Sequence, residues 1–270
     1  MADRKAMFVD TSVCTGCKAC QVACKEWNEL PMAEHIGFTG NSYDNTGHLG
    51  SVNWRHVKFV EQFSDNRQEQ RWLFLADSCK HCQQAGCMEV CPTNAIIRTE
   101  FDTVYIDHDI CIGCGYCVSG CPFGVIGIDD VKGTAQKCTF CYDRLQNGQQ
   151  PACAQSCPTD SIQFGNLSDL RSMANGRVNR LKQNGVTQAS IYGDEKVLGG
   201  LNAFYLLLDK PEVYGLPSNP QLPSKKSGGA YFSSVLGLIG MGLVGLLTFR
   251  ARRMEQIAQE KQSKIDKGVD

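Results

Sequence analysis

The amino-acid sequence predicts an α+β fold in which one small cysteine-rich domain is inserted into another, followed by a single C-terminal transmembrane helix. Three observations lead to this prediction. All 16 cysteines fall into four short runs. Three of these runs end in Cys-Pro followed by a short apolar stretch, so the runs are internal repeats. Near the C-terminus, residues 231–249 contain no charged side chain.

The four cysteine runs account for every cysteine of the 270-residue chain. In chain order they are Cys14-Cys17-Cys20-Cys24, Cys79-Cys82-Cys87-Cys91, Cys111-Cys114-Cys117-Cys121 and Cys138-Cys141-Cys153-Cys157. The third run continues into Pro122 and has the C-x2-C-x2-C-x3-C-P spacing of bacterial ferredoxins; the first has the same spacing without the proline. Four complete sets of four thiols predict four [4Fe–4S] clusters, and therefore a protein that transfers single electrons.

Disulfides and zinc explain this pattern less well. Disulfides need an oxidising compartment and usually a small secreted domain, and the first ten residues contain no apolar stretch of signal-peptide length. Zinc favours two C-x2-C pairs separated by a dozen or more residues, which only the fourth run approaches. The formal net charge of -1 provides no basic excess, so nothing indicates a nucleic-acid partner.

The order of the runs predicts the domain organisation. Residues 95–99 and 103–107 alternate weakly around a turn, which predicts a β-hairpin between runs two and three. We therefore expect residues 70–125 to form a complete ferredoxin-like domain with two clusters. Runs one and four, in residues 1–69 and 126–165, would form a second such domain into which the first is inserted.

Crossed ligation assigns the cysteines to clusters. In bacterial two-cluster ferredoxins the fourth cysteine of each run binds the cluster of the other run. The same rule predicts four sets here: set one, Cys14, Cys17, Cys20 and Cys157; set two, Cys24, Cys138, Cys141 and Cys153; set three, Cys79, Cys82, Cys87 and Cys121; set four, Cys91, Cys111, Cys114 and Cys117. The alternative, in which each run surrounds its own cluster, would strain four ligands on one short loop.

Residues 166–226 are predicted to form a C-terminal extension. Ser168–Lys182 has the periodicity of an amphipathic helix, with Ser168 as N-cap. Its expected buried face consists of Leu170, Met173, Val178 and Leu181. A buried strand is expected from Ala203, and the four prolines of residues 211–226 predict an extended connector.

Other parts of the sequence carry weaker signals. Residues 31–53 are rich in Gly, Asn and Ser and predict a long loop, for which a docking surface and a solvated loop are both open interpretations. The scattered histidines are assigned no metal, and His81 is expected behind the cluster ligands or at the surface. We find no catalytic triad, phosphate-binding loop or nucleotide fingerprint, so we expect no independent catalysis.

A transmembrane helix is predicted over residues 227–250. At about 1.5 Å per residue, the uncharged stretch 231–249 is roughly long enough to cross a hydrocarbon core of about 30 Å. Its four glycines would allow a second membrane helix to approach closely. Residues 251–270 form a basic tail, which places the C-terminus in the cytoplasm and the cluster domains on the periplasmic side of the inner membrane.

Three motifs resemble the iron–sulfur (beta) subunits of membrane-bound respiratory formate dehydrogenases. The segment from Cys14 to Asn28 is similar to the opening motif of that family, and the segment from Cys138 to Cys157-Pro is similar to its fourth motif. Residues 214–220 (Tyr-Gly-Leu-Pro-Ser-Asn-Pro) also resemble the family. The likeness covers nearly the whole chain.

The resemblance implies a position in an electron-transfer complex. A catalytic subunit with a molybdenum or tungsten pterin would oxidise formate, and its electrons would pass through the four clusters to a cytochrome b membrane subunit and then to quinone. The chain would be exported with the catalytic subunit by the twin-arginine route. Related subunits serve other molybdopterin reductases and some nickel–iron hydrogenases, so a hydrogenase partner remains an alternative. A self-contained enzyme and a structural zinc protein are less favoured alternatives.

Overall fold

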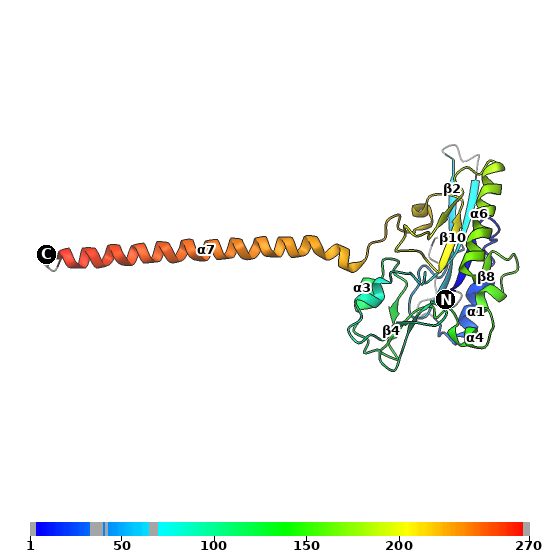
Figure 1. The fold of residues 1–270 in the computed structure, drawn as a ribbon, viewed down its shortest axis with the longest axis horizontal. Helices are drawn as coiled ribbons and strands as arrows, with labels where there is room; N and C mark the ends of the chain where they lie inside the picture. Colours follow the sequence, from blue (N-terminus) through cyan, green and yellow to red (C-terminus); the bar gives the residue numbers. More distant parts are fainter. Residues whose placement is uncertain (1–3, 33–39, 41–42, 65–69, 267–270) are drawn as a thin grey trace. The chain divides into compact units, whose positions relative to one another are not determined.

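The computed structural model describes residues 4–32, 40, 43–64 and 70–266. The chain divides into two compact units, Met1–Pro223 and Ser224–Asp270. Figure 1 shows the elements, which in chain order are β1 (Lys5–Asp10), α1 (Ala19–Trp27), β2 (Arg55–Phe63), β3 (Gln70–Ser78), α2 (Gly86–Glu89), β4 (Ile96–Arg98), β5 (Val104–Ile106), α3 (Tyr116–Gly120), β6 (Gly127–Ile128), β7 (Ala135–Gln136), α4 (Tyr142–Gln146), α5 (Ala152–Gln155), β8 (Ile162–Asn166), α6 (Leu167–Gln183), β9 (Ser190–Tyr192), β10 (Ala203–Leu207), the 3₁₀ helix η1 (Pro211–Tyr214) and α7 (Pro223–Asp266).

A four-stranded sheet with the order β8-β1-β10-β9 forms the centre of the first unit. β1 runs parallel to β10, with Phe8 opposite Phe204, and antiparallel to β8, with Met7 opposite Phe164. Every residue of β10 is buried, which confirms the buried strand predicted from Ala203. Burying a leucine side chain stabilises a fold by about 1.5–3 kcal/mol, so β10 contributes substantially to this core. The predicted C-terminal extension therefore completes a sheet that the N-terminus begins.

The helix predicted over Ser168–Lys182 is present as α6. It packs against β1 and β8 (Figure 1). Two details of the prediction were wrong. Met173 is 47% exposed, because Ala174, four residues after Leu170, lies on the buried face instead. The N-cap is Asn166 rather than Ser168, since the helix begins directly after β8. Its buried side chains are Leu170, Ala174 and Val178.

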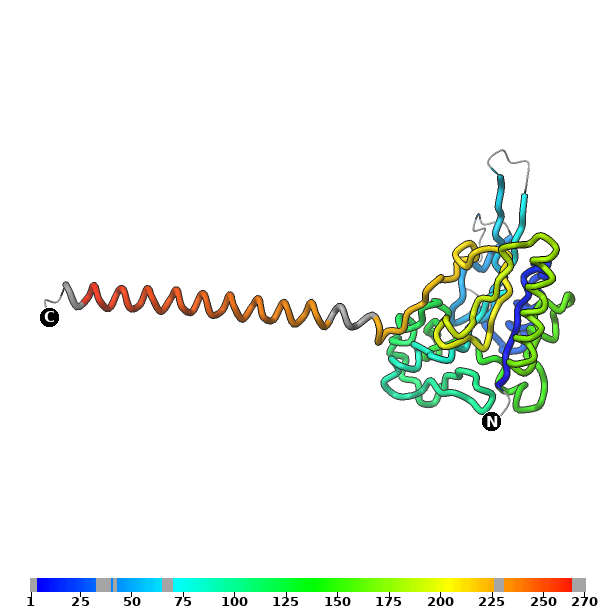
Figure 2. The backbone as a smooth tube through the Cα atoms, turned by 45° about the horizontal axis from the view of Figure 1, so that its top comes forward, coloured from blue at the N-terminus to red at the C-terminus, as the bar shows by residue number. Residues whose placement is uncertain are grey.

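Three two-stranded ribbons surround the sheet. β2 and β3 form the longest, and Figure 2 shows it running beside the sheet and projecting past it. β4 and β5 pair antiparallel with Ile96 opposite Ile106, which confirms the hairpin predicted between runs two and three. β6 and β7 form a shorter ribbon after run three.

Two hydrophobic cores fill the first unit, and cysteines belong to both. The first core lies among the sheet, α6 and the β2–β3 ribbon. The second contains Ile96, Val104 and Ile106 of the β4–β5 hairpin. Leu49, from the predicted loop 31–53, and the neighbouring Trp54 also pack in the second core. Part of that loop is therefore anchored, while 33–39 and 41–42 lie outside the described residues; its docking role stays a prediction.

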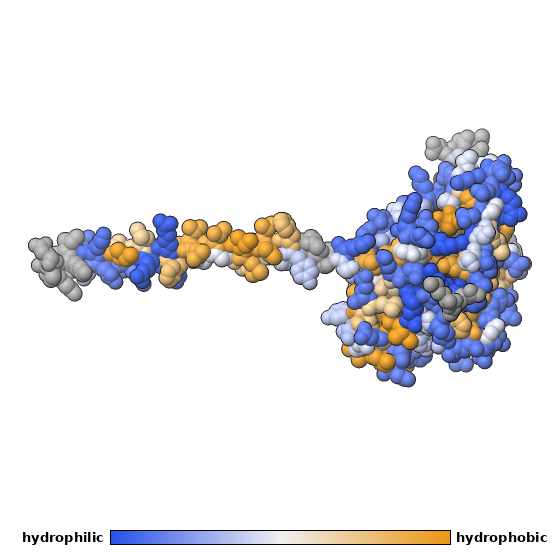
Figure 3. Space-filling view, in the orientation of Figure 1, coloured by the Kyte–Doolittle hydropathy of each residue, from blue (hydrophilic) through white to orange (hydrophobic). Residues whose placement is uncertain are grey.

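The second unit consists of α7. The stretch Tyr231–Ser263 is long and apolar enough to cross a membrane, by length and composition. Figure 3 shows an apolar band along the helix followed by hydrophilic side chains. The helix includes the predicted span 227–250 and continues through most of the predicted tail to Asp266. The extended connector predicted over 211–226 was wrong in part, because Pro211 begins η1 and Pro223 begins α7, where proline suits the first turn.

Candidate metal centres

The thiols of set one line a common cavity, although they come from distant parts of the chain. Cys20 lies in α1 and Cys157 lies two residues after the end of α5, and these two helices pack against each other. Val57 of β2 and Ala76 of β3 line the same cavity. The thiols that line it are Cys14, Cys17, Cys20 and Cys157.

A second cavity is lined by the thiols of set two, Cys24, Cys138, Cys141 and Cys153. All four are buried. Cys24 follows Cys20 by four residues in α1, so one face of one helix supplies thiols to both cavities. Trp54 and Arg55, at the start of β2, complete the wall on the side of the ribbon.

The remaining eight thiols gather around α2 and α3, which pack against each other. A third cavity is lined by Cys91, Cys111, Cys114 and Cys117, the members of set four. The members of set three are neighbours too: burial, and after it the nearby thiols of Cys79, Cys121 and Cys87, raise the pKa of Cys82 well above its ordinary value. The structure thus brings together the four thiols of each predicted set.

The same backbone turn recurs in all four runs. In each run the residue directly before the second cysteine has a positive φ, at Gly16 (68°), His81 (45°), Gly113 (66°) and Phe140 (64°). This turn reverses the chain so that two cysteines three residues apart face one centre. Glycine adopts positive φ without steric cost, so Gly16 and Gly113 suit this turn, whereas His81 and Phe140 give no such signal in the sequence.

His81 and Phe140 are held in this strained conformation by their surroundings. A positive φ at such a residue costs on the order of 1–3 kcal/mol. His81 is fully buried, and its Nδ1 accepts a hydrogen bond from the backbone N–H of Val104 at 3.0 Å. The rings of His81 and Phe140 meet edge to face with centroids 4.5 Å apart. His81 therefore lies behind the thiols and not at the surface.

Amide groups point at several of the sulfurs. The backbone N–H of Ala135 donates to Cys111 Sγ at 3.4 Å, and the N–H of Phe140 donates to Cys138 Sγ at 3.4 Å. The side-chain amide of Asn28 lies 3.7 Å from the sulfur of Cys24. Hydrogen bonds to ligand sulfurs are one of the means by which proteins tune iron–sulfur clusters.

The chemistry of these thiols fits iron–sulfur clusters. Burial raises the pKa of Cys20, Cys87 and Cys138 to about 12, whereas bound iron would hold them as thiolates. Among the described residues, no three His, Cys, Asp or Glu side chains converge closely enough to hold a single metal ion. Four thiols around one cavity suit a cluster, in which each thiolate binds its own iron atom.

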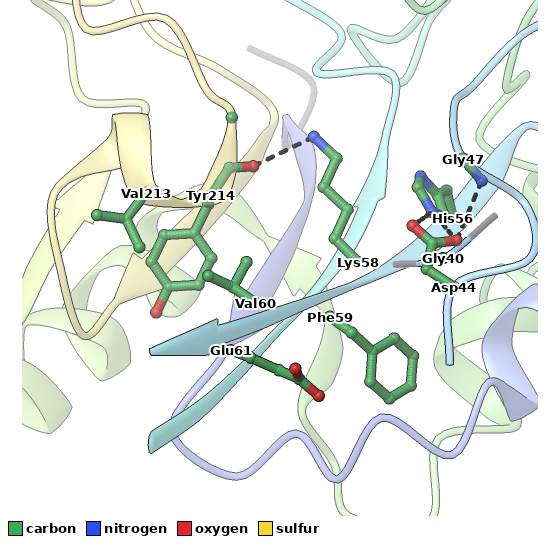
Figure 4. A pocket seen from close by; sticks show the side chains of 11 residues that line it. Gly40, Asp44, Gly47, His56, Lys58, Phe59, Val60, Glu61, Val213 and Tyr214 are labelled. Carbon is green, nitrogen blue, oxygen red and sulfur yellow. Dashed lines mark hydrogen bonds and ion pairs between the residues drawn. The ribbon is translucent and has the colours of Figure 1, made fainter. Parts of the chain in front are cut away.

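A cavity of about 370 Å³ lies outside the thiol sets. Figure 4 shows its lining residues on β2, on the preceding loop and near η1. Lys58 Nζ donates to the carbonyl oxygen of Tyr214 at 3.2 Å, and His56 Nε2 lies 2.7 Å from the Asp44 carboxylate. These polar groups are already partnered, and none of the described residues that line the cavity is a cysteine. The thiol sets therefore remain the candidate site.

Comparison with known proteins identifies the family. A family model described as a 4Fe-4S dicluster domain matches residues 70–167, and another with the same description matches residues 13–95. The iron–sulfur subunit of the nitrate-inducible formate dehydrogenase of Escherichia coli (strain K12) is 40% identical over 226 residues, which cover 82% of this chain and 75% of that protein. The chain belongs to the family of formate dehydrogenase iron–sulfur subunits.

Other relatives agree with this assignment. The formate dehydrogenase iron–sulfur subunit of Haemophilus influenzae is 41% identical over 221 residues, covering 80% of this chain and 70% of that protein. The B subunit of the anaerobic dimethyl sulfoxide reductase of Escherichia coli is 36% identical over 171 residues, covering 63% of this chain and 78% of that protein. The chain is thus a [4Fe–4S] electron-transfer subunit of an oxidoreductase complex, while the number of clusters and their ligand sets stay predictions.

Substitution of two glycines in run three tests the turn geometry. A Cβ at Gly113 would lie 2.0 Å from the carbonyl oxygen of Gly133, whereas at Gly115 it would meet nothing within 4 Å. Both residues have positive φ, which costs an alanine about 1–2 kcal/mol. We expect Gly113→Ala to lose about four irons per chain, one cluster, and Gly115→Ala to keep them. Iron and acid-labile sulfide analysis measures this; equal iron contents would contradict the steric interpretation.

Serine substitution of cysteines tests crossed ligation. If Cys157 belongs to set one, Cys157→Ser should remove or convert the same electron paramagnetic resonance (EPR) signal as Cys17→Ser. Cys141→Ser should affect a different signal, because Cys141 belongs to set two. The three variants are compared in the same reduced complex. Loss of one shared signal in Cys157→Ser and Cys141→Ser, with the Cys17→Ser signal separate, would instead favour runs that close around their own clusters.

Proposed function

We propose that this subunit carries electrons through four [4Fe–4S] clusters, one in each predicted thiol set, from a formate-oxidising molybdopterin subunit to a cytochrome b membrane subunit. The observation that carries the proposal is the gathering of thiols from different runs, in groups of four, around common cavities. Bound there, each cluster supplies reversible one-electron chemistry. The protein supplies the thiols, their hydrogen bonds and their burial.

Shared elements support the order one, two, three, four. Sets one and two are joined by α1, which carries Cys20 and Cys24 one turn apart. Sets two and three adjoin at Cys138, whose pKa is raised most by burial and next by the thiol of Cys79. Sets three and four are joined at α2, where Cys87 of set three is followed by Cys91 of set four. Each step therefore passes between neighbours.

Exposure of the thiols supports entry and exit at the two ends of the row. Cys17 of set one and Cys114 of set four are exposed. All four thiols of set two are buried, and none in set three is exposed. Apolar side chains surround Cys114, with Ile112 67% and Tyr116 60% exposed. Figure 3 shows apolar surface over the α3 and β4 part of this unit. Terminal clusters near the surface suit electron exchange with partner subunits.

The identity of the partners rests on the relatives. Those described above are named as subunits of formate dehydrogenase and dimethyl sulfoxide reductase, which favours a molybdopterin (Mo or W) catalytic partner. The greater coverage by the formate dehydrogenase subunits favours formate as the substrate of that partner. A nickel–iron hydrogenase or another molybdopterin reductase is the alternative.

The helix α7 is proposed to anchor the subunit in the lipid of the inner membrane, beside a membrane helix of the cytochrome b subunit. Its apolar stretch is followed by Arg250, Arg252 and Arg253. By the positive-inside rule these residues favour a cytoplasmic C-terminus and a periplasmic cluster-bearing unit. Export would then occur together with the catalytic subunit.

Purification of the complex tests the electron donor. We expect the subunit, tagged and extracted in mild detergent, to co-purify with a pterin-containing large subunit. Formate should then reduce the clusters, seen as loss of visible absorbance and appearance of EPR signals. Hydrogen gas is the matched control donor and should leave the clusters oxidised. Reduction by hydrogen and not by formate, with a nickel–iron subunit present, would move the assignment to the alternative.

Protease protection tests the proposed sidedness. In intact spheroplasts, added protease should digest the unit before α7 and leave an epitope tag after Asp270 protected. Inside-out vesicles should give the reverse pattern, because the tail then faces the protease. A cluster-bearing unit protected in spheroplasts and digested in inside-out vesicles would place it in the cytoplasm and contradict the proposal.

A further inference from the structure

Arg55 is a buried cation without a carboxylate partner among the described residues. Its side chain belongs to a residue only 2% exposed. One guanidinium nitrogen donates to the carbonyl oxygen of Ala76 at 3.1 Å and another to Met7 Sδ at 2.9 Å, both uncharged acceptors. Burying a charge in this way is expensive unless an opposite charge compensates it.

Arg55 lies close to thiols of both set one and set two, since its charge partly offsets the rise that burial causes in the pKa of Cys20 and of Cys138. Arg55 lines the cavity of set two. Val57, two residues along β2 and therefore on the same face of the strand, lines the cavity of set one. Ala76, whose carbonyl accepts from Arg55, lines the cavity of set one as well. The position of Arg55 is thus shared by the two thiol sets.

The groups that act most on the charge of Arg55 are cysteines of sets one and two, followed by Tyr205. Burial would lower the pKa of Arg55, but the thiolates of Cys153, Cys20 and Cys138 raise it above its ordinary value. Two of these belong to set two and one to set one. A cluster with four thiolate ligands carries a net negative charge, so filled sites would supply the compensation that the guanidinium otherwise lacks.

Lys80, a buried cation near set three, differs from Arg55 because it has a carboxylate partner. Its ammonium lies 2.5 Å from the Asp77 carboxylate, and Lys58 contacts the same carboxylate at 3.2 Å. Although burial alone would raise the pKa of Asp77, Lys80 and then Lys58 lower it to about 2. Lys80 therefore has a carboxylate counter-charge within the protein, although it also partly offsets the rise that burial causes in the pKa of Cys82 and Cys121. Arg55 has no such carboxylate among the described residues.

We propose that Arg55 is a fixed positive charge that raises the midpoint potentials of the clusters in sets one and two. The inference rests on the proposed function and adds a residue that tunes it. Reduction adds one electron to a cluster, and a nearby positive charge in a medium of low dielectric constant stabilises the added negative charge. Arginine stays protonated throughout, so the electron arrives and leaves without a proton from Arg55.

The test uses the assembled complex with Arg55→Gln, which removes the charge and keeps an amide donor for Ala76. EPR-monitored redox titration should show two of the clusters harder to reduce. We expect at least a tenfold fall in their reduction equilibrium constants, or about 59 mV for one electron. The other clusters should shift less. Arg55→Lys keeps the charge and should retain the wild-type potentials.

Arg171→Gln is the matched control. Arg171 is a partly buried arginine that donates to the carbonyl oxygen of Gly193 and lies over the ring of Phe204. No cysteine is among the groups that shift its pKa. Its substitution should leave all potentials unchanged. If the complex with Arg55→Gln does not assemble, the potentials are measured in Arg55→Lys instead. Lowered potentials in that variant would contradict a role that depends on charge alone.

Different results would overturn the proposed function and the proposed role of Arg55. A wild-type complex without reducible iron–sulfur signals would overturn the proposed function itself. A wild-type complex with normal clusters, combined with unchanged potentials in Arg55→Gln, would overturn only the role of Arg55. An equal downward shift in Arg55→Gln and Arg55→Lys would assign Arg55 to packing rather than to electrostatics.

Discussion

Thiols from segments far apart in the sequence meet in groups of four, and this meeting constrains the whole of the first unit. Cys157 can reach the cavity of Cys14 only if α5 returns to α1, and β8, which follows, then pairs with β1. Cysteines are members of both hydrophobic cores, so cluster ligation and core packing involve the same residues. Folding of this unit and binding of the clusters are therefore expected to be coupled, as in other small metal-binding domains.

Local patterns predicted the local structure. Alternation around a turn identified the β4–β5 hairpin, the 3.6-residue period identified α6, and an apolar run identified β10. Cysteine spacing predicted which thiols gather, because a shared cluster requires four thiols around one centre. The errors arose at positions where contacts with other helices and strands determine the structure. The inward position of Ala174 rather than Met173 depends on the strands against which α6 packs, and the parallel pairing of β10 with β1 has no local signal.

Three features of the site could not be read from the sequence for the same reason. The positive φ of His81 and Phe140 is maintained by contacts between residues of different runs. The ion pair of Asp77 with Lys58 depends on β2 lying beside β3. Arg55 is one of many arginines until the fold buries it beside two thiol sets. Charge and strain at these positions are properties of the assembled chain.

The helix α1 has a further consequence. Cys20 and Cys24 lie on one helix of only nine residues, and α5 packs against that helix. Electron-tunnelling rates fall steeply with the distance between donor and acceptor. Thermal motion of loops would therefore make the rate of transfer between clusters in sets one and two variable if their thiols lay on separate loops. In the proposed electron path, α1 would hold the distance between the clusters of sets one and two constant. The rate of electron transfer between them should then be insensitive to motion elsewhere in the polypeptide.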